Sequence, residues 1–140
     1  MTAEGFEYFE VAADVGVHGW GPNLAACFRQ MALGVFNLMV PLPAVRATES
    51  REVFAQGDTP EALLVNWLNE LLYLHDVEEF VVSDVAPPRI ERDRIHVTLT
   101  GEPVAPDRHP RGVLVKAATF HGLELSETPG LVSARVIVDI

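Results

Sequence analysis

Between Asn23 and Pro41, apolar residues recur at intervals of three and four. They are Leu24, Cys27, Phe28, Met31, Val35, Leu38 and Met39. This spacing predicts a helix with one buried face. Asn23 is a residue type that favours the cap position before a helix, and Pro41 and Pro43 should end the helix. We therefore interpret Cys27, Met31 and Met39 as core residues.

A second helix is predicted from a stripe of leucines and one tryptophan. The stripe consists of Leu63, Leu64, Trp67, Leu68, Leu71, Leu72 and Leu74. Its width predicts a largely buried helix. Two caps are compatible with its start. Either Asp58 caps the helix and Glu61 returns the hydrogen bond, or Thr59 caps it with Pro60 at the first helical position.

The remaining apolar segments alternate or are short, which is typical of strands. They cover residues 6–20 (one or two strands with a bend around 13–16), 44–55, 80–85, 90–100 (with a tight turn near Arg92 and Asp93), 112–120, 123–126 and 131–140, the last after a turn at 128–130. Two buried helices against antiparallel strands predict an α+β fold. We expect residues 1–140 to form a single domain without a linker.

Composition agrees with one folded domain in a reducing compartment. Hydrophobic residues make up 49% of the 140 residues. The chain has one cysteine, which excludes an intramolecular disulfide and a cysteine-cluster zinc site. The first ten residues show no secretory signal, and no apolar run approaches the roughly 18 residues needed to cross a bilayer. We therefore expect a cytoplasmic protein without a membrane association.

Charge narrows the expected partners. Twenty acidic and ten basic residues give a net charge of −10. Strong nucleic-acid binding depends on cationic side chains that neutralise phosphates, so strong direct binding is not expected, and neither is an anionic membrane surface. Cations and proteins with a basic face are the favoured partners.

Two separate acidic positions are candidate metal ligands. Asp14 lies in the apolar run VAADVGV, where an ionised carboxylate needs a cation or several donors. Asp139 and the α-carboxylate of Ile140 place two further carboxylates side by side after a predicted strand. Clustered oxygen ligands suit calcium, magnesium or manganese. The residues alone equally allow a turn aspartate at Asp14 and a solvated chain end.

The histidines show no metal-ligand spacing on one helix. His75 would lie at the end of the second helix, His96 in a strand, and His109 in an exposed loop. Lys116 and His121 flank one strand end and could bind an anion. No nucleophile elbow, phosphate loop or dinucleotide fingerprint is present, so no catalytic residue is predicted.

Several segments together resemble the archease family. They are residues 9–19, with Ala-Asp before an apolar-Gly-apolar step; the helix at 23–39; LLVNWLNELLYLH at 63–75; Gly-Glu at 101–102; VKAATFH at 115–121; and the closing RVIVDI. The similarity runs nearly end to end. It departs at Val11 and Ala12, where the family often has histidine and threonine.

The resemblance implies a function and a site. Archeases are small acidic activators of RtcB-type tRNA-splicing RNA ligases; they promote guanylylation of the ligase by GTP and its repeated turnover, and are not ligases themselves. The implied metal site combines Asp14, Asp139 and the terminal Ile140, with calcium ranked before magnesium and manganese. Lys116, His121 and Glu102 match family motifs and are further candidates, although Lys116 could instead pair with Glu124.

Two other classes of function remain open from the sequence. One is a metal-dependent hydrolase that uses the same carboxylates, although the sequence shows no general base near Asp14. The other is a chaperone-like protein-binding module, which the high apolar content permits.

Overall fold

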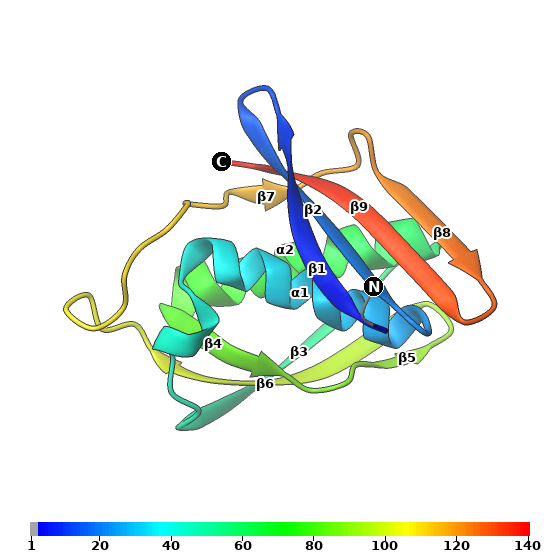
Figure 1. Ribbon diagram of the computed structural model, residues 1–140. Coiled ribbons are helices and arrows are strands. Elements are labelled where there is room, and N and C mark those ends of the chain that lie inside the picture. The colour runs from blue at the N-terminus through cyan, green and yellow to red at the C-terminus, as the bar shows by residue number, and fades with distance from the viewer. Residues whose placement is uncertain (1–2) are drawn as a thin grey trace.

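Two antiparallel sheets with two helices between them make up the structure (Figure 1). The computed structural model describes residues 3–140, so Met1 and Thr2 of the predicted domain lie outside the described residues. The first sheet has the order β1 (Gly5–Val11), β2 (Asp14–Gly21), β9 (Leu131–Asp139) and β7 (Ala117–Ala118), and β8 (Glu124–Thr128) also pairs with β9. The predicted α+β class is confirmed.

The second sheet and the helices complete the layers. This sheet has the order β3 (Glu49–Gln56), β6 (Arg94–Pro103) and β4 (Phe80–Val85), with β5 (Arg89–Glu91) paired to β6. Helix α1 (Leu24–Met39) packs mainly on β1 and β2, and helix α2 (Pro60–Glu78) mainly on β3. Among residues 3–140, no helix combines the length and apolarity needed to span a bilayer.

The core forms where the two helices meet both sheets. Phe28 of α1 stacks on Trp67 of α2, with 6.0 Å between the ring centroids, and neither side chain is exposed. Cys27, Met31 and Met39 are buried as predicted. Because interiors are close-packed, the helices cannot shift without opening a void against one of the sheets.

Local capping fixes where both helices begin. The Asn23 side chain accepts the Ala26 N–H at 2.8 Å, which confirms the predicted start of α1. Of the two caps considered for α2, Thr59 is the one used: its hydroxyl accepts the Ala62 N–H at 3.0 Å, and Pro60 follows at the first helical position.

Two predicted strands are shorter than expected. The prediction over residues 44–55 is wrong at its start, where the 3₁₀ turn η1 (Leu42–Ala44) precedes β3. The prediction over residues 112–120 is wrong except at β7. Gly112 and Val113 donate their N–H groups to Met39 and Leu38 at 2.8 Å, so this segment satisfies carbonyl groups at the end of α1.

The turns follow the predicted places with one shift. The first hairpin turns at Ala12 and Ala13, and Asp14 already belongs to β2. The predicted bend covers 13–16, so the observed turn begins one residue earlier and is shorter. The turns at Arg92 and at Gly130 are confirmed, with left-handed φ angles of 57° and 80°.

An ionic cluster with a buried carboxylate and a buried imidazole, which we call the Glu102 latch, joins β6 to the loop that follows it. It consists of Glu102, Arg108 and His109. Glu102 is 5% exposed; it accepts the Arg46 N–H at 2.7 Å and the His109 Nε2–H at 2.9 Å, and it pairs with the Arg108 guanidinium. His109 is 1% exposed, so the expectation of an exposed loop histidine is wrong.

The tautomer of His109 follows from its two partners. Its Nδ1 accepts the Ala105 N–H at 2.8 Å, so the ring proton sits on Nε2 and points to Glu102. The Arg108 guanidinium, helped by the Arg46 N–H and by His109, lowers the pKa of Glu102 from 4.5 to about 2. The latch thereby anchors the loop that leads to β7.

Exchange of the capping hydroxyl tests the assignment at α2. We expect Thr59→Ala to lower the free energy of unfolding by about 1 kcal/mol, because the Ala62 N–H loses its partner. The neighbouring Asp58→Ala is the matched control and should change stability by no more than a few tenths of a kcal/mol. Urea unfolding of both variants measures the difference. A larger loss in Asp58→Ala would contradict this assignment.

Removal of the Glu102 charge tests the latch. The pKa of Glu102 is lowered, so its ionised form contributes stability above about pH 4.5, and this contribution is lost as the pH falls toward 2. We expect Glu102→Gln to be less stable than the native chain at neutral pH, with a gap that narrows below pH 4.5. Urea unfolding at several pH values measures it. Glu70→Gln, on the exposed face of α2, should show no such gap.

Candidate functional site

Asp14 and Asp139 lie at neighbouring ends of adjacent strands. The antiparallel ladder of β2 and β9 runs from Gly21↔Val132 to Val15↔Val138, and the next position in this register brings Asp14 opposite Asp139. Opposed residues of antiparallel strands share a face, with Cβ atoms about 4.5–5.5 Å apart. The sheet order therefore brings two acidic residues that are far apart in the sequence to adjacent strand ends.

Strand β7 adds Lys116 to the same corner of the sheet. Ala117 pairs with Asp139, and the Lys116 N–H donates to the Asp139 carbonyl oxygen at 2.8 Å. This register places Lys116 beside Ile140, and in Figure 1 the C-terminus lies close to β7 and the tip of the first hairpin. We call this corner of the sheet the acidic corner; it combines Asp14, Asp139, Ile140 and Lys116.

Lys116 is not paired with Glu124, the alternative considered from the sequence. Glu124 lies 3.8 Å from Arg135 instead. Within residues 3–140, the ammonium group of Lys116 has no ion-pair partner, and the residue is exposed. It is therefore free to contact an anionic group brought to this corner.

Asn69 of α2 holds β7 in position, a role that the sequence analysis missed. Its amide nitrogen donates to the Ala118 carbonyl at 3.1 Å, and its amide oxygen accepts the Ala118 N–H at 2.8 Å. The side chain acts like one more strand edge, opposite β9. The available signal was a polar residue within a leucine-rich helix, which demands a hydrogen-bonding partner when it is half buried.

The other sequence candidates lie elsewhere. His121 is exposed beyond the opposite side of β7 from Lys116, so the structure does not bring these two residues to one strand end. Glu102 belongs to the latch, where its carboxylate is already held by donors. His75 lies in the last turn of α2, as predicted, and its ring donates to the Phe80 carbonyl at 3.0 Å.

The donor set at the corner suits a hard cation only if the chain end contributes. Over the described range 3–140, no three histidine, cysteine, aspartate or glutamate side chains are placed to hold a metal ion. Asp14 and Asp139 supply two carboxylates, and the third would be the α-carboxylate of Ile140. Carboxylate oxygens are the ligands that calcium, magnesium and manganese prefer.

Comparison with known proteins identifies relatives of this chain. A family model described as the Archease protein family (MTH1598/TM1083) matches residues 6–140. The protein archease of Methanothermobacter thermautotrophicus is 39% identical over 140 residues, covering 98% of this chain and 99% of the relative. An archease-like protein of Drosophila melanogaster is 34% identical over 86% of this chain and 79% of its own length. These relatives are named for the family and not for a catalysed reaction.

Solved structures agree. The solution structure of protein 1598 from Methanobacterium thermoautotrophicum matches with a TM-score of 0.81 and 37% identity, over 97% of this chain and 99% of that one. A crystal structure from Thermotoga maritima, described as an archease and possible chaperone, matches with a TM-score of 0.66 over 96% of each chain; at 16% identity it shows the fold alone. The family model covers residues 6–140, and relatives aligned over nearly their full length are more than one-third identical to this chain. This chain therefore belongs to the archease family.

Proposed function

We propose that this protein is a non-catalytic activator of an RtcB-type RNA ligase in tRNA splicing or RNA repair. It would promote guanylylation of the ligase by GTP and allow multiple turnover. Family membership supports the class of function. The observation that carries the proposal is the register of β2 on β9, which sets Asp14 beside Asp139.

The proposed site holds a divalent cation between Asp14, Asp139 and the terminal carboxylate of Ile140. Calcium ranks first because it accepts carboxylates in flexible geometry, whereas magnesium demands a near-ideal octahedron. When bound, such an ion supplies positive charge that offsets the charge of a triphosphate. Asp14 and Asp139, on adjacent strands, fix the spacing of the carboxylates, and the pairing of β7 with β9 keeps Lys116 beside them.

The charge of the protein supports docking on a basic partner. With a net charge of −10, it is attracted to the cationic face on which an RNA ligase binds its substrate. Docking that contacts the guanylylation-competent conformation more strongly than other conformations shifts the ligase toward that state. Lys116, exposed at the same corner, would meet phosphate oxygens.

Metal titration tests the site without the ligase. We expect Asp14→Asn and Asp139→Asn each to lower the affinity for calcium at least about tenfold, because each removes one charged ligand. Calorimetric titration of the purified protein with calcium, then with magnesium and manganese, provides the measurement. The matched control is Asp58→Asn. Asp58 is an exposed acid just before α2, and it lies near Leu24, which follows the end of β2 that is opposite to Asp14. Equal calcium affinities in the native chain and the three variants would contradict the proposed metal site.

Reconstitution tests the activity. The protein is mixed with the ligase of the same cell, GTP, a divalent metal and RNA ends, and products are counted per ligase. We expect many turnovers with the native chain and about one turnover with Asp14→Ala or Asp139→Ala, whereas Asp58→Ala should stimulate normally. Undiminished stimulation by both site variants would separate the acidic corner from the mechanism.

The same proteins distinguish a chaperone-like role, which the description of the Thermotoga maritima neighbour raises. General suppression of aggregation that is indifferent to Asp14→Ala, without stimulation of the ligase, would favour that role. Hydrolysis of phosphoesters that depends on added metal and on Asp14 would favour a hydrolase.

A further inference from the structure

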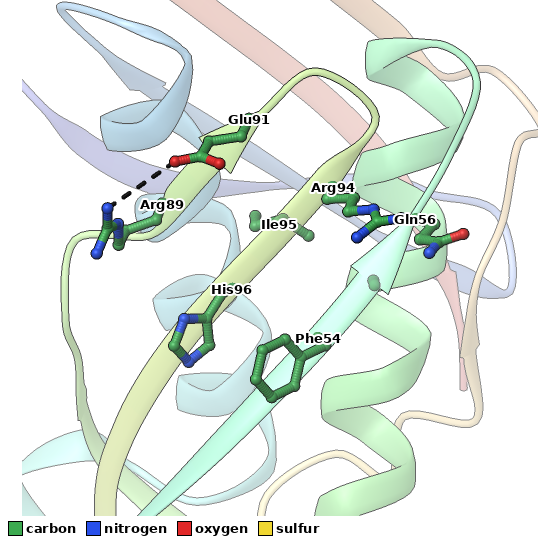
Figure 2. Close-up of a pocket in the computed structure, with 8 residues that line it drawn as sticks. Phe54, Gln56, Arg89, Glu91, Arg94, Ile95 and His96 are labelled. Carbon is green, nitrogen blue, oxygen red and sulfur yellow. Dashed lines mark ion pairs between the residues drawn. The ribbon is translucent and has the colours of Figure 1, made fainter.

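The outer face of the second sheet carries a shallow pocket far from the acidic corner in the fold. Its volume is about 600 Å³, and it lies over the ends of β3, β5 and β6 (Figure 2). The side chains that shape it are Phe54, Gln56, Arg89, Glu91, Arg94 and His96. Nothing in the proposed ligase activation uses this surface.

The strand registers place these six side chains in two rows on one face. Opposed residues across β5, β6 and β3 share a face of the sheet, as do residues two apart along a strand. One row runs Arg89, His96, Phe54, and the next runs Glu91, Arg94, Gln56. The rows thus combine two guanidinium groups, two rings, one amide and one carboxylate in a single patch.

Phe54 and His96 form an aromatic platform. Their rings are parallel within 3°, with centroids 4.3 Å apart, and Figure 2 shows them next to each other on adjacent strands. The edge of the imidazole is also held from β3, because His96 Nε2 lies 2.8 Å from Glu52 Oε1. Phe54 is nevertheless 64% exposed. A further planar group can therefore extend this stack and remove apolar surface from water.

The two guanidinium groups next to the platform are available to an anion. Arg94 has no ion-pair or side-chain hydrogen-bond partner in the part of the chain that the structure describes. Arg89 lies 3.9 Å from Glu91, but both side chains are more than three-quarters exposed, so this ion pair is weak. Guanidinium groups bind phosphate and carboxylate oxygens, and an aromatic ring beside them favours a phosphate that is joined to a planar base.

We propose that this pocket binds a nucleotide. The base stacks on the Phe54–His96 platform, a phosphate contacts Arg94, and the Gln56 amide reaches the edge of the base. This chemistry is shared by a free nucleoside triphosphate and by the unpaired end of an RNA. Aromatic stacking next to cationic side chains is the arrangement by which proteins hold unpaired nucleotides.

The acidic charge of the whole protein limits the affinity without abolishing binding. Charges beyond about 8 Å are largely screened at physiological salt, so the charges in and beside the pocket decide the interaction. Glu91 pairs with Arg89 and Glu52 with His96, which leaves Arg94 as the guanidinium group that meets the anion. The expected complex is therefore weaker than that of a dedicated RNA-binding protein, which agrees with the absence of strong nucleic-acid binding expected from composition. The inference does not rest on the proposed ligase activation.

Titration of the purified protein tests the pocket with two probes, GTP and a five-nucleotide single-stranded RNA. Chemical shifts of the backbone amides should change along β3, β5 and β6 with at least one probe, and saturate. We expect Phe54→Ala to weaken this binding about tenfold, and Arg94→Gln to weaken it and reduce its dependence on salt. The matched control is Phe120→Ala, a phenylalanine that is 57% exposed beyond β7 and should bind normally.

The pattern of results decides the inference. Binding of GTP that is weakened in Phe54→Ala supports it and identifies a free nucleotide; the same weakening with RNA supports it and identifies an RNA end. No saturable binding of either probe, or equal binding by Phe54→Ala, overturns it. Phe54 is exposed, so its variant should keep the native melting temperature, which serves as the check of folding. Because no ligase is present, failure here leaves the activation experiment untouched.

Discussion

The pairing of β9 with β2 is the constraint on which the rest of the first sheet depends. β9 pairs with β2 and also with β7 and β8. Its residues alternate so that Val132, Ala134, Val136 and Val138 point into the core. A slip of one residue would turn this whole set toward solvent, so hydrophobic burial fixes the register. Packing of the core therefore places Asp14 next to Asp139, although their two negative charges repel each other.

Two weaker devices then refine the same corner. β7 is too short to be stable alone, and Asn69 supplies a side-chain amide where another strand would be. The segment before β7 follows the end of α1 through two backbone hydrogen bonds, and the Glu102 latch anchors the loop further upstream. The backbone on either side of Lys116 is therefore fixed, at Gly112 and Val113 before it and at Ala118 after it, although the segment has little regular secondary structure.

Sequence reasoning worked where the physics is local. Asn23, Thr59 and the prolines after α1 act within one turn of helix, so the helix bounds could be predicted closely. It failed for His109, whose burial depends on Glu102 on another element, and for Gly112 and Val113, whose partners are carbonyl groups of α1. Asp14 and Asp139 could be named as candidates from the sequence and a family resemblance. Their adjacency required the sheet order, which periodicity does not encode.

The β2–β9 ladder also has a consequence for how the molecule is made. It joins positions separated by almost the whole described chain, so a nascent polypeptide emerging from a ribosome cannot close the first sheet until β9 has left the exit tunnel. Until then β2 has an unpaired edge, and α1 has little cover on that side. Such distant pairing is slow to nucleate. The acidic corner can therefore exist only in chains that have been translated through β9, and a prematurely terminated product would carry neither the closed sheet nor its paired carboxylates.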